Sequence, residues 1–246
     1  MQLNQITQQR QLLYFSRDAD AMAIYENQHY RWLAFNQVIQ TLMLKRDAWR
    51  LTLPHQRYMM LPLLYFKPQT LLEFGLGGGS FQRFIHHLTP AINLCSVEYN
   101  DSVIQCFERF FWGNVETAGV LSADARQYLQ HHSVKCFDWL IYDIYQQADD
   151  ETNSFQTLLQ DWTLLLTKSS ANAWLTMNIP NATKPELQQL LVAFEQINQQ
   201  KQLSYFYVPR YRNVIIHVHP PITERVKSYL PIYQQRRWQK LWQTRL

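Results

Sequence analysis

The segment Leu71-Leu72-Glu73-Phe74-Gly75-Leu76-Gly77-Gly78-Gly79-Ser80 decides the fold. The chain of 246 residues contains six glycines, and four of them lie in this segment. Glycine adopts positive φ and lets a ligand approach the backbone, so this cluster predicts a turn that side chains would obstruct. Thr70–Phe74 is typical of a short buried strand and Ser80–Leu88 of a helix. We predict the strand, turn and helix that open a nucleotide-binding α/β fold, with an ordinary tight turn as the alternative.

The spacing of these glycines indicates which nucleotide binds. A dinucleotide fingerprint needs glycine where Ser80 stands, and a P-loop needs a lysine that is absent here. The pattern that fits folds binding S-adenosylmethionine and its relatives is an acidic residue followed by alternate glycines: Glu73, Gly75, Gly77 and Gly79. About twenty residues further on, Glu98 ends the predicted strand Ile92–Val97, where its carboxylate can accept both hydroxyls of a ribose.

Length and composition are those of a globular protein with one full α/β domain and a small annex. Hydrophobic residues make up 47% of the chain, and the net charge of +4 does not indicate a nucleic-acid partner. The longest apolar run, Met59–Phe66, is too short to span a membrane and is interrupted by Pro62. We expect a cytoplasmic protein without a metal, whose cysteines are reduced and buried: Cys95, Cys106 and Cys136.

Residues 1–52 are predicted to form a separate antiparallel β annex. Short apolar or alternating runs, separated by polar breaks, predict strands over Gln11–Ser16, Ala21–Tyr25, Tyr30–Phe35 and Val38–Lys45. Asn36-Gln37 has the composition of a two-residue turn between the last two. We expect the aromatic side chains of this region to pack the annex rather than bind a ligand: Tyr25, Tyr30, Trp32, Phe35 and Trp49.

Residues 53–246 are predicted to form the second domain. The segment Pro54–Phe66 is predicted to form a helix. After it, strands alternate with helices: the strands are at 70–74, 92–97, near 118–121, 139–142 and 173–177, and the helices are at 80–88, 101–111, 125–130, 154–166 and 184–199. This order predicts a mostly parallel sheet covered on both faces. Ser204–Val208 and Val214–Val218 suit an antiparallel hairpin at one edge. The predicted fold class is α/β, with a Rossmann-like sheet of the class I S-adenosylmethionine-dependent methyltransferase type and the N-terminal β annex.

The tail, residues 220–246, interleaves basic and aromatic residues. One interpretation is a basic patch that binds nucleic acid. The interpretation we favour is an amphipathic helix that docks its Trp and Tyr face while its basic side chains stay solvated.

Acidic residues follow four of the predicted strands, where open α/β sheets bind their ligands: Glu73, Glu98, Asp124 and Asp143. Asp143 comes directly after an apolar run, so its carboxylate can act as a general base or hold a cation. Asp124 precedes Ala125–Gln130 and has helix capping as its alternative role.

With these residues, the chain resembles the spermidine synthase family, the polyamine aminopropyltransferases, over nearly its full length. The annex stretch 24–41 is similar to the family's N-terminal hairpin and includes Gln40 at the end of its turn. The glycine loop is followed in the family's order by Val97-Glu98-Tyr99-Asn100, Ala123-Asp124-Ala125, Asp143 and Pro209-Arg210-Tyr211.

The resemblance implies transfer of an aminopropyl group from decarboxylated S-adenosylmethionine to a small amine by a homodimer. Glu98 would hold the ribose, Asp124 with Ala125 would lie on the adenine side, and the glycine loop with Gly78 would complete the cofactor site. Asp143 would take the proton from the attacking amine, with Tyr145 in the same turn. Gln40 and Tyr30 would approach from the annex.

Departures from the family pattern leave other functions open. Gly78 stands where the family's glycine loop carries an Asp, and Gln146-Gln147 stand where a second acid and a proline follow Asp143. The family's Tyr-x-Glu does not match Pro54-His55-Gln56. One alternative is methyl transfer from intact S-adenosylmethionine, whose carboxylate an Asp at position 78 would repel. A second is an adenosyl-binding scaffold without catalysis.

Overall fold

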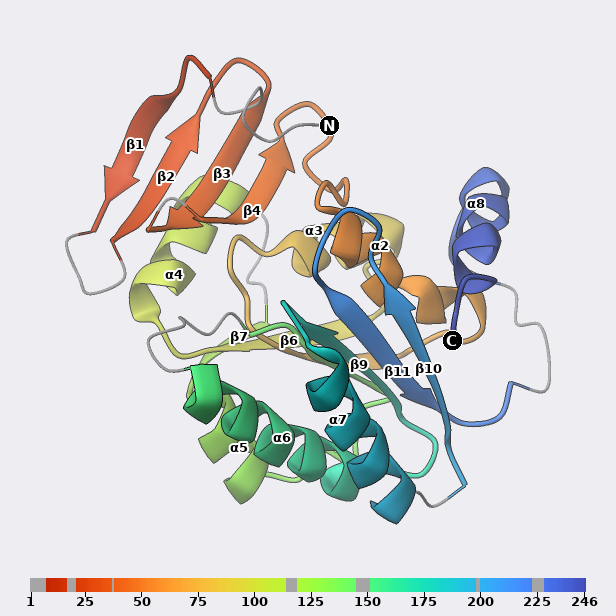
Figure 1. Ribbon diagram of the computed structural model, residues 1–246. Helices are drawn as coiled ribbons and strands as arrows, with labels where there is room; N and C mark the ends of the chain where they lie inside the picture. Colours follow the sequence, from red (N-terminus) through yellow and green to blue (C-terminus); the bar gives the residue numbers. More distant parts are fainter. Residues whose placement is uncertain are drawn as a thin grey trace.

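The computed structural model describes residues 8–16, 21–36, 38–113, 119–144, 151–197, 200–222 and 228–246. These residues form a four-stranded sheet at the N-terminal end and a seven-stranded sheet that makes up the centre of the molecule (Figure 1). The smaller sheet stands over one end of the larger one, drawn at the upper left of Figure 1.

The four-stranded sheet is the predicted annex. Its strands pair in chain order and antiparallel: β1 (Gln11–Phe15), β2 (Met22–Glu26), β3 (Tyr30–Phe35) and β4 (Val38–Leu44). Phe35 pairs with Val38, and Asn36 between them has a φ of 45°, as a tight hairpin turn requires. The predicted turn residue Gln37 lies outside the described residues.

The seven-stranded sheet has the order β10-β11-β9-β8-β5-β6-β7. Its strands are β5 (Thr70–Phe74), β6 (Asn93–Glu98), β7 (Gly119–Ser122), β8 (Trp139–Tyr142), β9 (Trp174–Ile179), β10 (Gln202–Tyr207) and β11 (Val214–His219). Five neighbouring strands of this sheet run parallel, in the order β9, β8, β5, β6 and β7. The hairpin β10–β11 closes one edge, and both of its strand pairings, with each other and with β9, are antiparallel. The predicted Rossmann-like sheet and its edge hairpin are therefore confirmed.

Helices cover both faces of this sheet because neighbouring strand residues point to opposite sides. Leu71 belongs to the apolar core under α3 (Ser80–Leu88) and α8 (Ile232–Trp242), whereas Leu72 belongs to the core on the other face. That second face is covered by α5 (Ala125–His131), α6 (Glu151–Lys168) and α7 (Lys184–Ile197), seen at the bottom of Figure 1.

Two predicted helices differ from those observed. The helix predicted over Pro54–Phe66 is divided into α2 (Pro54–Met59) and the short 3-10 helix η1 (Leu61–Leu64). Pro62 explains the break, since it has no N–H to donate and its ring clashes with the preceding turn. The helix predicted over Asp101–Phe111 is α4 (Asp101–Cys106) continued by the π-helix η2 (Phe107–Trp112).

The C-terminal helix docks as the favoured interpretation predicts. In α8, Trp238 and Trp242 are buried, and the basic residues Arg236, Arg237 and Lys240 are exposed. Tyr233, expected on the docked face, is 69% exposed because it lies in the first turn, away from the core. Among the described helices, none is long and apolar enough to cross a membrane.

The expectation that all three cysteines are buried is wrong for one of them. Cys106 is buried and Cys95 is half-buried, whereas Cys136 is exposed in the turn before β8. All three are free thiols.

The annex shares a core with the larger unit. Its buried residues Met22, Ile24 and Leu33 pack with Leu76 of the glycine loop and with α4 and η2, including Phe107. This packing holds the annex directly over the carboxyl ends of the parallel strands.

Candidate active site

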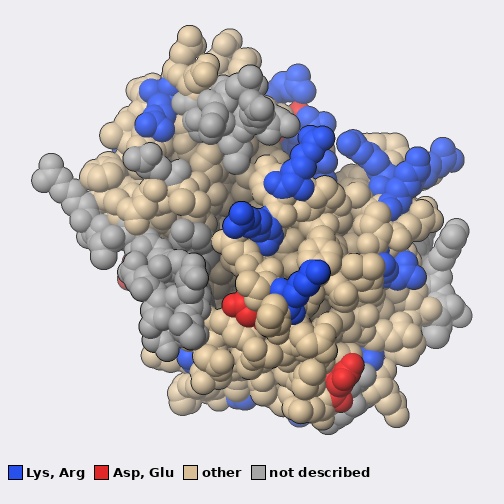
Figure 2. All heavy atoms as spheres, viewed as in Figure 1, with Lys and Arg blue, Asp and Glu red and all other residues tan. Residues whose placement is uncertain are grey.

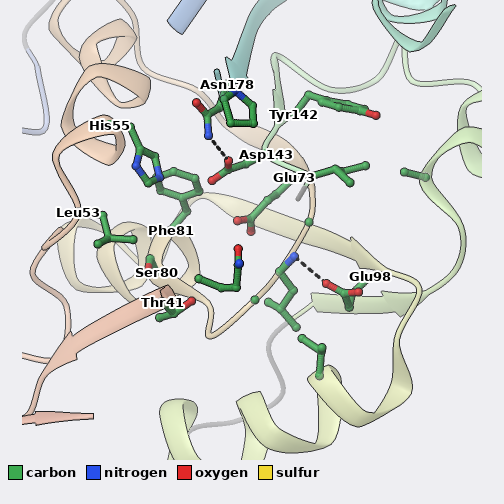
Figure 3. A pocket seen from close by; sticks show the side chains of 18 of the residues that line it. Thr41, Leu53, His55, Glu73, Ser80, Phe81, Glu98, Tyr142, Asp143 and Asn178 are labelled. Atoms are coloured by element: carbon green, nitrogen blue, oxygen red, sulfur yellow. Dashed lines mark hydrogen bonds between the residues drawn. The ribbon is translucent and has the colours of Figure 1, made fainter. Parts of the chain in front are cut away.

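A cavity of about 900 Å³ lies between the annex and the carboxyl ends of the parallel strands. The glycine loop, the ends of β6, β7, β8 and β9, the annex strand β4 and the loop between β10 and β11 all contribute to its lining. Figure 3 shows His55, Asp143 and Asn178 together at one end of this cavity, Glu98 at the other, and Glu73 between them.

The glycine loop has the predicted strand–turn–helix geometry. Gly75 has a φ of 95°, and a Cβ there would collide with the backbone carbonyl of Asp143. Gly79 caps α3 in the left-handed region with a φ of 65°, and a Cβ there would collide with the ring of Phe107. The loop therefore needs glycine for close packing against β8 and η2, in addition to any space that a ligand requires.

Gly78 faces the annex. Its N–H donates to Thr41 Oγ1 at 2.8 Å, and a Cβ at this position would lie 2.7 Å from Thr41 Cγ2. Its carbonyl accepts from the buried guanidinium of Arg83, which also donates to the carbonyl of Ala48 at 2.7 Å. Burial lowers the pKa of Arg83 to about 9. An acidic side chain has no room at position 78, where the annex occupies the space.

Polar groups project from five neighbouring strands in one row. Because the strand order is β9-β8-β5-β6-β7, the row along the sheet edge is Asn178, Asp143, Glu73, Glu98 and Asp124. All five line the cavity. The prediction that these carboxyl groups gather at one edge of the sheet is therefore confirmed, and the sheet places one polar group per strand.

Glu98 and Asp124 are held by backbone N–H groups. Glu98 accepts from the N–H of Leu76 at 3.2 Å and of Asn100 at 3.0 Å, and it is 8% exposed. Burial raises its pKa, although these backbone donors oppose the shift. Asp124 is the N-cap of α5 and accepts from the N–H of Gln127 at 2.8 Å. Asp124 therefore takes the capping role, and it also lines the cavity. A carboxylate has about four lone pairs, so both groups keep acceptor capacity for a ligand.

Glu73 lies in the middle of the row and is the most buried of its carboxyl groups, at 2% exposure. It accepts from Ser96 Oγ, which in turn accepts from Gln82 Nε2 at 2.7 Å. Burial raises the pKa of Glu73 to about 8, the Ser96 hydroxyl opposes this, and the charges of Asp143 and Glu98 add to it. Even with the opposing charge of the nearby Arg83, Glu73 is therefore mainly a neutral carboxylic acid at neutral pH.

Asp143 is fixed by a chain of amides. Asn178 Nδ2 donates to Asp143 Oδ1 at 2.7 Å (Figure 3). Asn213 Nδ2 in turn donates to Asn178 Oδ1 at 2.9 Å. Asp143 is half-buried and lines the cavity. A carboxylate held in this way is suited to accept a proton or to anchor a cation.

His55 completes this end of the cavity. It lies in α2 and lines the cavity with Phe81 and Asp143 (Figure 3). Burial lowers its pKa, and the negative charge of Asp143 opposes that shift. His55 is therefore mainly neutral at neutral pH.

The structure places most of the predicted site residues in one cavity. Gln40, Gly75, Gly77 and Ala125 line it together with the four acids. Gly78 and Gly79 lie behind the lining, and Tyr30 packs within the annex. Tyr145 falls outside the described residues.

Other lining residues carry functional groups that sequence reasoning missed: Phe35, Thr41, His55, Arg126, Asp161, Asn178, Arg210, Arg212 and Asn213. Phe35, expected only to pack the annex, borders the cavity. Asn178 could have been found, because it occupies on β9 the same strand-end position as the acids. Within the described ranges, no group of three or more His, Cys, Asp or Glu side chains could hold a metal ion.

No protein-family model matches the chain. Two curated relatives match parts of it, and both are named polyamine aminopropyltransferase. The Vibrio vulnificus protein is 29% identical over 134 residues, which are 50% of this chain and 44% of the relative. The Chromobacterium violaceum protein is 39% identical over 77 residues, 31% of this chain and 30% of the relative. The matched stretches span less than half of either relative.

Solved structures share the fold over most of the chain. A probable spermidine synthase from Corynebacterium glutamicum has a TM-score of 0.67 at 12% identity, covering 85% of this chain and 79% of its own. A spermidine synthase in complex with the transition state analogue AdoDATO has a TM-score of 0.64 at 12% identity, and the match covers 86% of this chain and 74% of that structure's chain. Human methyltransferase-like protein 13 in complex with SAH has a TM-score of 0.56 at 16% identity, and the match covers 78% of this chain and 93% of that structure's chain.

The chain has a Rossmann-like α/β fold, which it shares with spermidine synthase and methyltransferase structures. Over the matched stretches its sequence is similar to two polyamine aminopropyltransferases, and their names support the resemblance to the spermidine synthase family.

Proposed function

We propose that this chain is a transferase that moves an aminopropyl group from decarboxylated S-adenosylmethionine to an amine, as the names of its curated relatives suggest. The observation that carries the proposal is the row of carboxyl groups ending at Asp143, which the amide of Asn178 fixes at the wall of the cavity. This row offers a separate carboxyl group to each polar or cationic part of the two reactants.

The order of the row supports one direction for the cofactor in this proposal. The adenosine occupies the end formed by Glu98 and Asp124, with the ribose hydroxyls on Glu98. The aminopropyl arm then runs along the sheet edge across Glu73, which lies on the next strand. Its ammonium group ionises Glu73, because an opposite charge close to a buried acid lowers the pKa of that acid. Gly78, enclosed by Thr41, leaves this task to Glu73.

The reaction needs orientation and one proton acceptor. The amine nitrogen attacks the methylene carbon that is bonded to the sulfonium sulfur, a C–N bond forms, and the C–S bond breaks. The electron pair of that bond returns to sulfur, and methylthioadenosine leaves as a neutral thioether. Asp143 accepts the proton that the nitrogen loses, and its hydrogen bond from Asn178 keeps the carboxylate aimed at the nitrogen.

Methyl transfer from intact S-adenosylmethionine is the second candidate. It is favoured by Gly78, since no carboxylate at this position would repel the carboxylate of the intact cofactor. The fold of the SAH-bound human methyltransferase-like protein is compatible with it.

The reaction products distinguish aminopropyl transfer from methyl transfer. We expect purified protein to release methylthioadenosine when it is incubated with decarboxylated S-adenosylmethionine and a mixture of primary amines. Mass spectrometry measures this release. Intact S-adenosylmethionine with the same amines should release neither methylthioadenosine nor S-adenosylhomocysteine above the rate without protein. Release of S-adenosylhomocysteine instead would replace aminopropyl transfer by methyl transfer.

A further inference from the structure

Among the described residues, two arginines and one aspartate line the acceptor end of the cavity. We propose that the acceptor amine bears a carboxylate, which Arg210 and Arg212 bind, in place of the second ammonium group of a diamine. This inference rests on the proposed transfer reaction and names the class of its acceptor.

The two arginines come from a loop that is tied to Asp143. Residues 209–213 connect β10 to β11 and fold into a tight turn, with the N–H of Val208 bonded to the carbonyl of Asn213 at 3.0 Å. The side chain of Asn213 continues through Asn178 to Asp143. One hydrogen-bonded chain therefore sets the position of the arginine loop relative to the proposed base.

The backbone of this loop is strained at Arg210. Its φ of 67° lies in the left-handed region, which a long side chain rarely adopts. Such strain persists only where the surroundings impose it, and it gathers at ligand-binding sites. Arg210 lines the cavity, so it brings a positive charge to the cavity wall.

The charges of the described lining divide into two groups. At the adenosine end, Arg126 is paired with Asp161 at 2.7 Å, so this pair adds no net charge. At the acceptor end, Asp143 lines the cavity together with Arg210 and Arg212, two exposed side chains of the loop that Asn213 and Asn178 tie to it. In the described part of the chain, no ion pair engages either arginine. Figure 2 shows that basic side chains outnumber acidic ones on the face viewed.

This distribution opposes a diamine. One ammonium of a diamine would meet Asp143, and the other would lie beside guanidinium groups, where like charges repel and no described carboxylate compensates. An amine that carries a carboxylate matches both ends: its nitrogen reaches Asp143, and its carboxylate accepts charge-assisted hydrogen bonds from the arginines. Electrostatic complementarity of this kind sets specificity.

The test compares three acceptors of equal chain length: 4-aminobutyrate, putrescine and butylamine. With decarboxylated S-adenosylmethionine, we expect methylthioadenosine release to show a kcat/KM at least about tenfold higher for 4-aminobutyrate than for putrescine. The double variant Arg210→Ala/Arg212→Ala should lose this preference, because its kcat/KM for 4-aminobutyrate falls relative to that for putrescine. The control variant Arg236→Ala/Arg237→Ala, on the exposed side of α8, should keep the preference.

A second measurement needs no turnover. Calorimetric binding of the same amines to protein saturated with methylthioadenosine should show the same order, with 4-aminobutyrate bound more tightly than putrescine. If 4-aminobutyrate binds more tightly than putrescine but no amine supports release of methylthioadenosine, the proposed transfer reaction is wrong. The proposal that the site binds an amine bearing a carboxylate is then retained. If putrescine binds or reacts better, or if the arginine variant keeps the preference, the acceptor class is wrong whatever the reaction.

Discussion

The two ends of the cavity are built differently. The adenosine end consists of the glycine loop and strand-end acids, and Glu98 is fixed by backbone N–H groups of Leu76 and Asn100. The acceptor end consists of side chains from the annex, from α2 and from the loop 209–213, fixed by the amides of Asn178 and Asn213. Backbone donors belong to the fold, whereas side-chain donors change with each substitution.

This difference separates what the fold determines from what the individual chain determines. The proposed adenosine end follows from a strand–turn–helix unit that the clustered glycines make possible. At the proposed acceptor end, His55, Asn178 and Asn213 come from segments that carry no such local pattern. We therefore expect variants at the two ends to separate cofactor affinity from acceptor chemistry.

The largest effect is expected at the acceptor end, for Asp143→Asn. Asparagine keeps the oxygen that accepts from Asn178 and removes the proton acceptor, so kcat for methylthioadenosine release should fall by about 10²–10⁴. The affinity for methylthioadenosine, measured by calorimetry, should stay within about twofold, because this ligand does not reach Asp143.

The matched control is Glu195→Gln, an exposed acid-to-amide change in α7. It should leave both quantities unchanged. An Asp143→Asn enzyme with full activity would exclude Asp143 as the base and would direct attention to His55.

The next effect concerns the adenosine end. Glu98→Ala removes the acceptor of the ribose hydroxyls, and losing charge-assisted hydrogen bonds costs about 1.5–3 kcal/mol, or roughly ten- to a hundredfold in affinity for methylthioadenosine. Because Glu98 also accepts from Leu76 and Asn100, Glu98→Gln and a thermal unfolding curve of each variant distinguish lost ligand contacts from a disordered loop. Unchanged affinity in a folded Glu98→Ala protein would remove adenosine from this end.

Sequence reasoning reached the fold and the lining of the proposed adenosine end because both depend on local patterns. Alternating strands and helices, four clustered glycines and acids at the ends of four strands are visible in single segments. The reason for the glycines was only partly predictable: Gly79 is required by the ring of Phe107, which lies in the π-helix that no pattern indicated. The contact depends on tertiary packing.

The acceptor end escaped prediction for the same reason. His55, Asn178 and Arg210 come from three distant segments that meet only when α2, β9 and the loop 209–213 assemble around Asp143. Hydrophobic periodicity places elements, but it does not place the side chains of loops. Pro62, in contrast, was visible in the sequence and should have limited the helix predicted over Pro54–Phe66.

The last prediction, whose expected effect is smallest per pH unit, tests the border between the two ends, at Glu73. Its folded-state pKa of about 8 lies above the usual value of 4.5, so its contribution to stability is complete below about 4.5 and is lost as the pH rises through about 8. In this window the free energy of unfolding should fall with a slope of at most about 1.4 kcal/mol per pH unit, and Glu73→Gln should remove that slope. Denaturant unfolding at several pH values measures the slope.

Ligand binding should reveal the same proton. An ammonium group placed beside Glu73 lowers its pKa, so decarboxylated S-adenosylmethionine should release up to one proton per molecule bound near pH 7. Methylthioadenosine, which has no ammonium group, should release none, and Glu73→Gln should release none with either ligand. Calorimetry in two buffers with different heats of ionisation counts these protons. Equal proton release by both ligands would show that the aminopropyl arm does not pass Glu73, and the cofactor would then lie in another direction along the row of carboxyl groups.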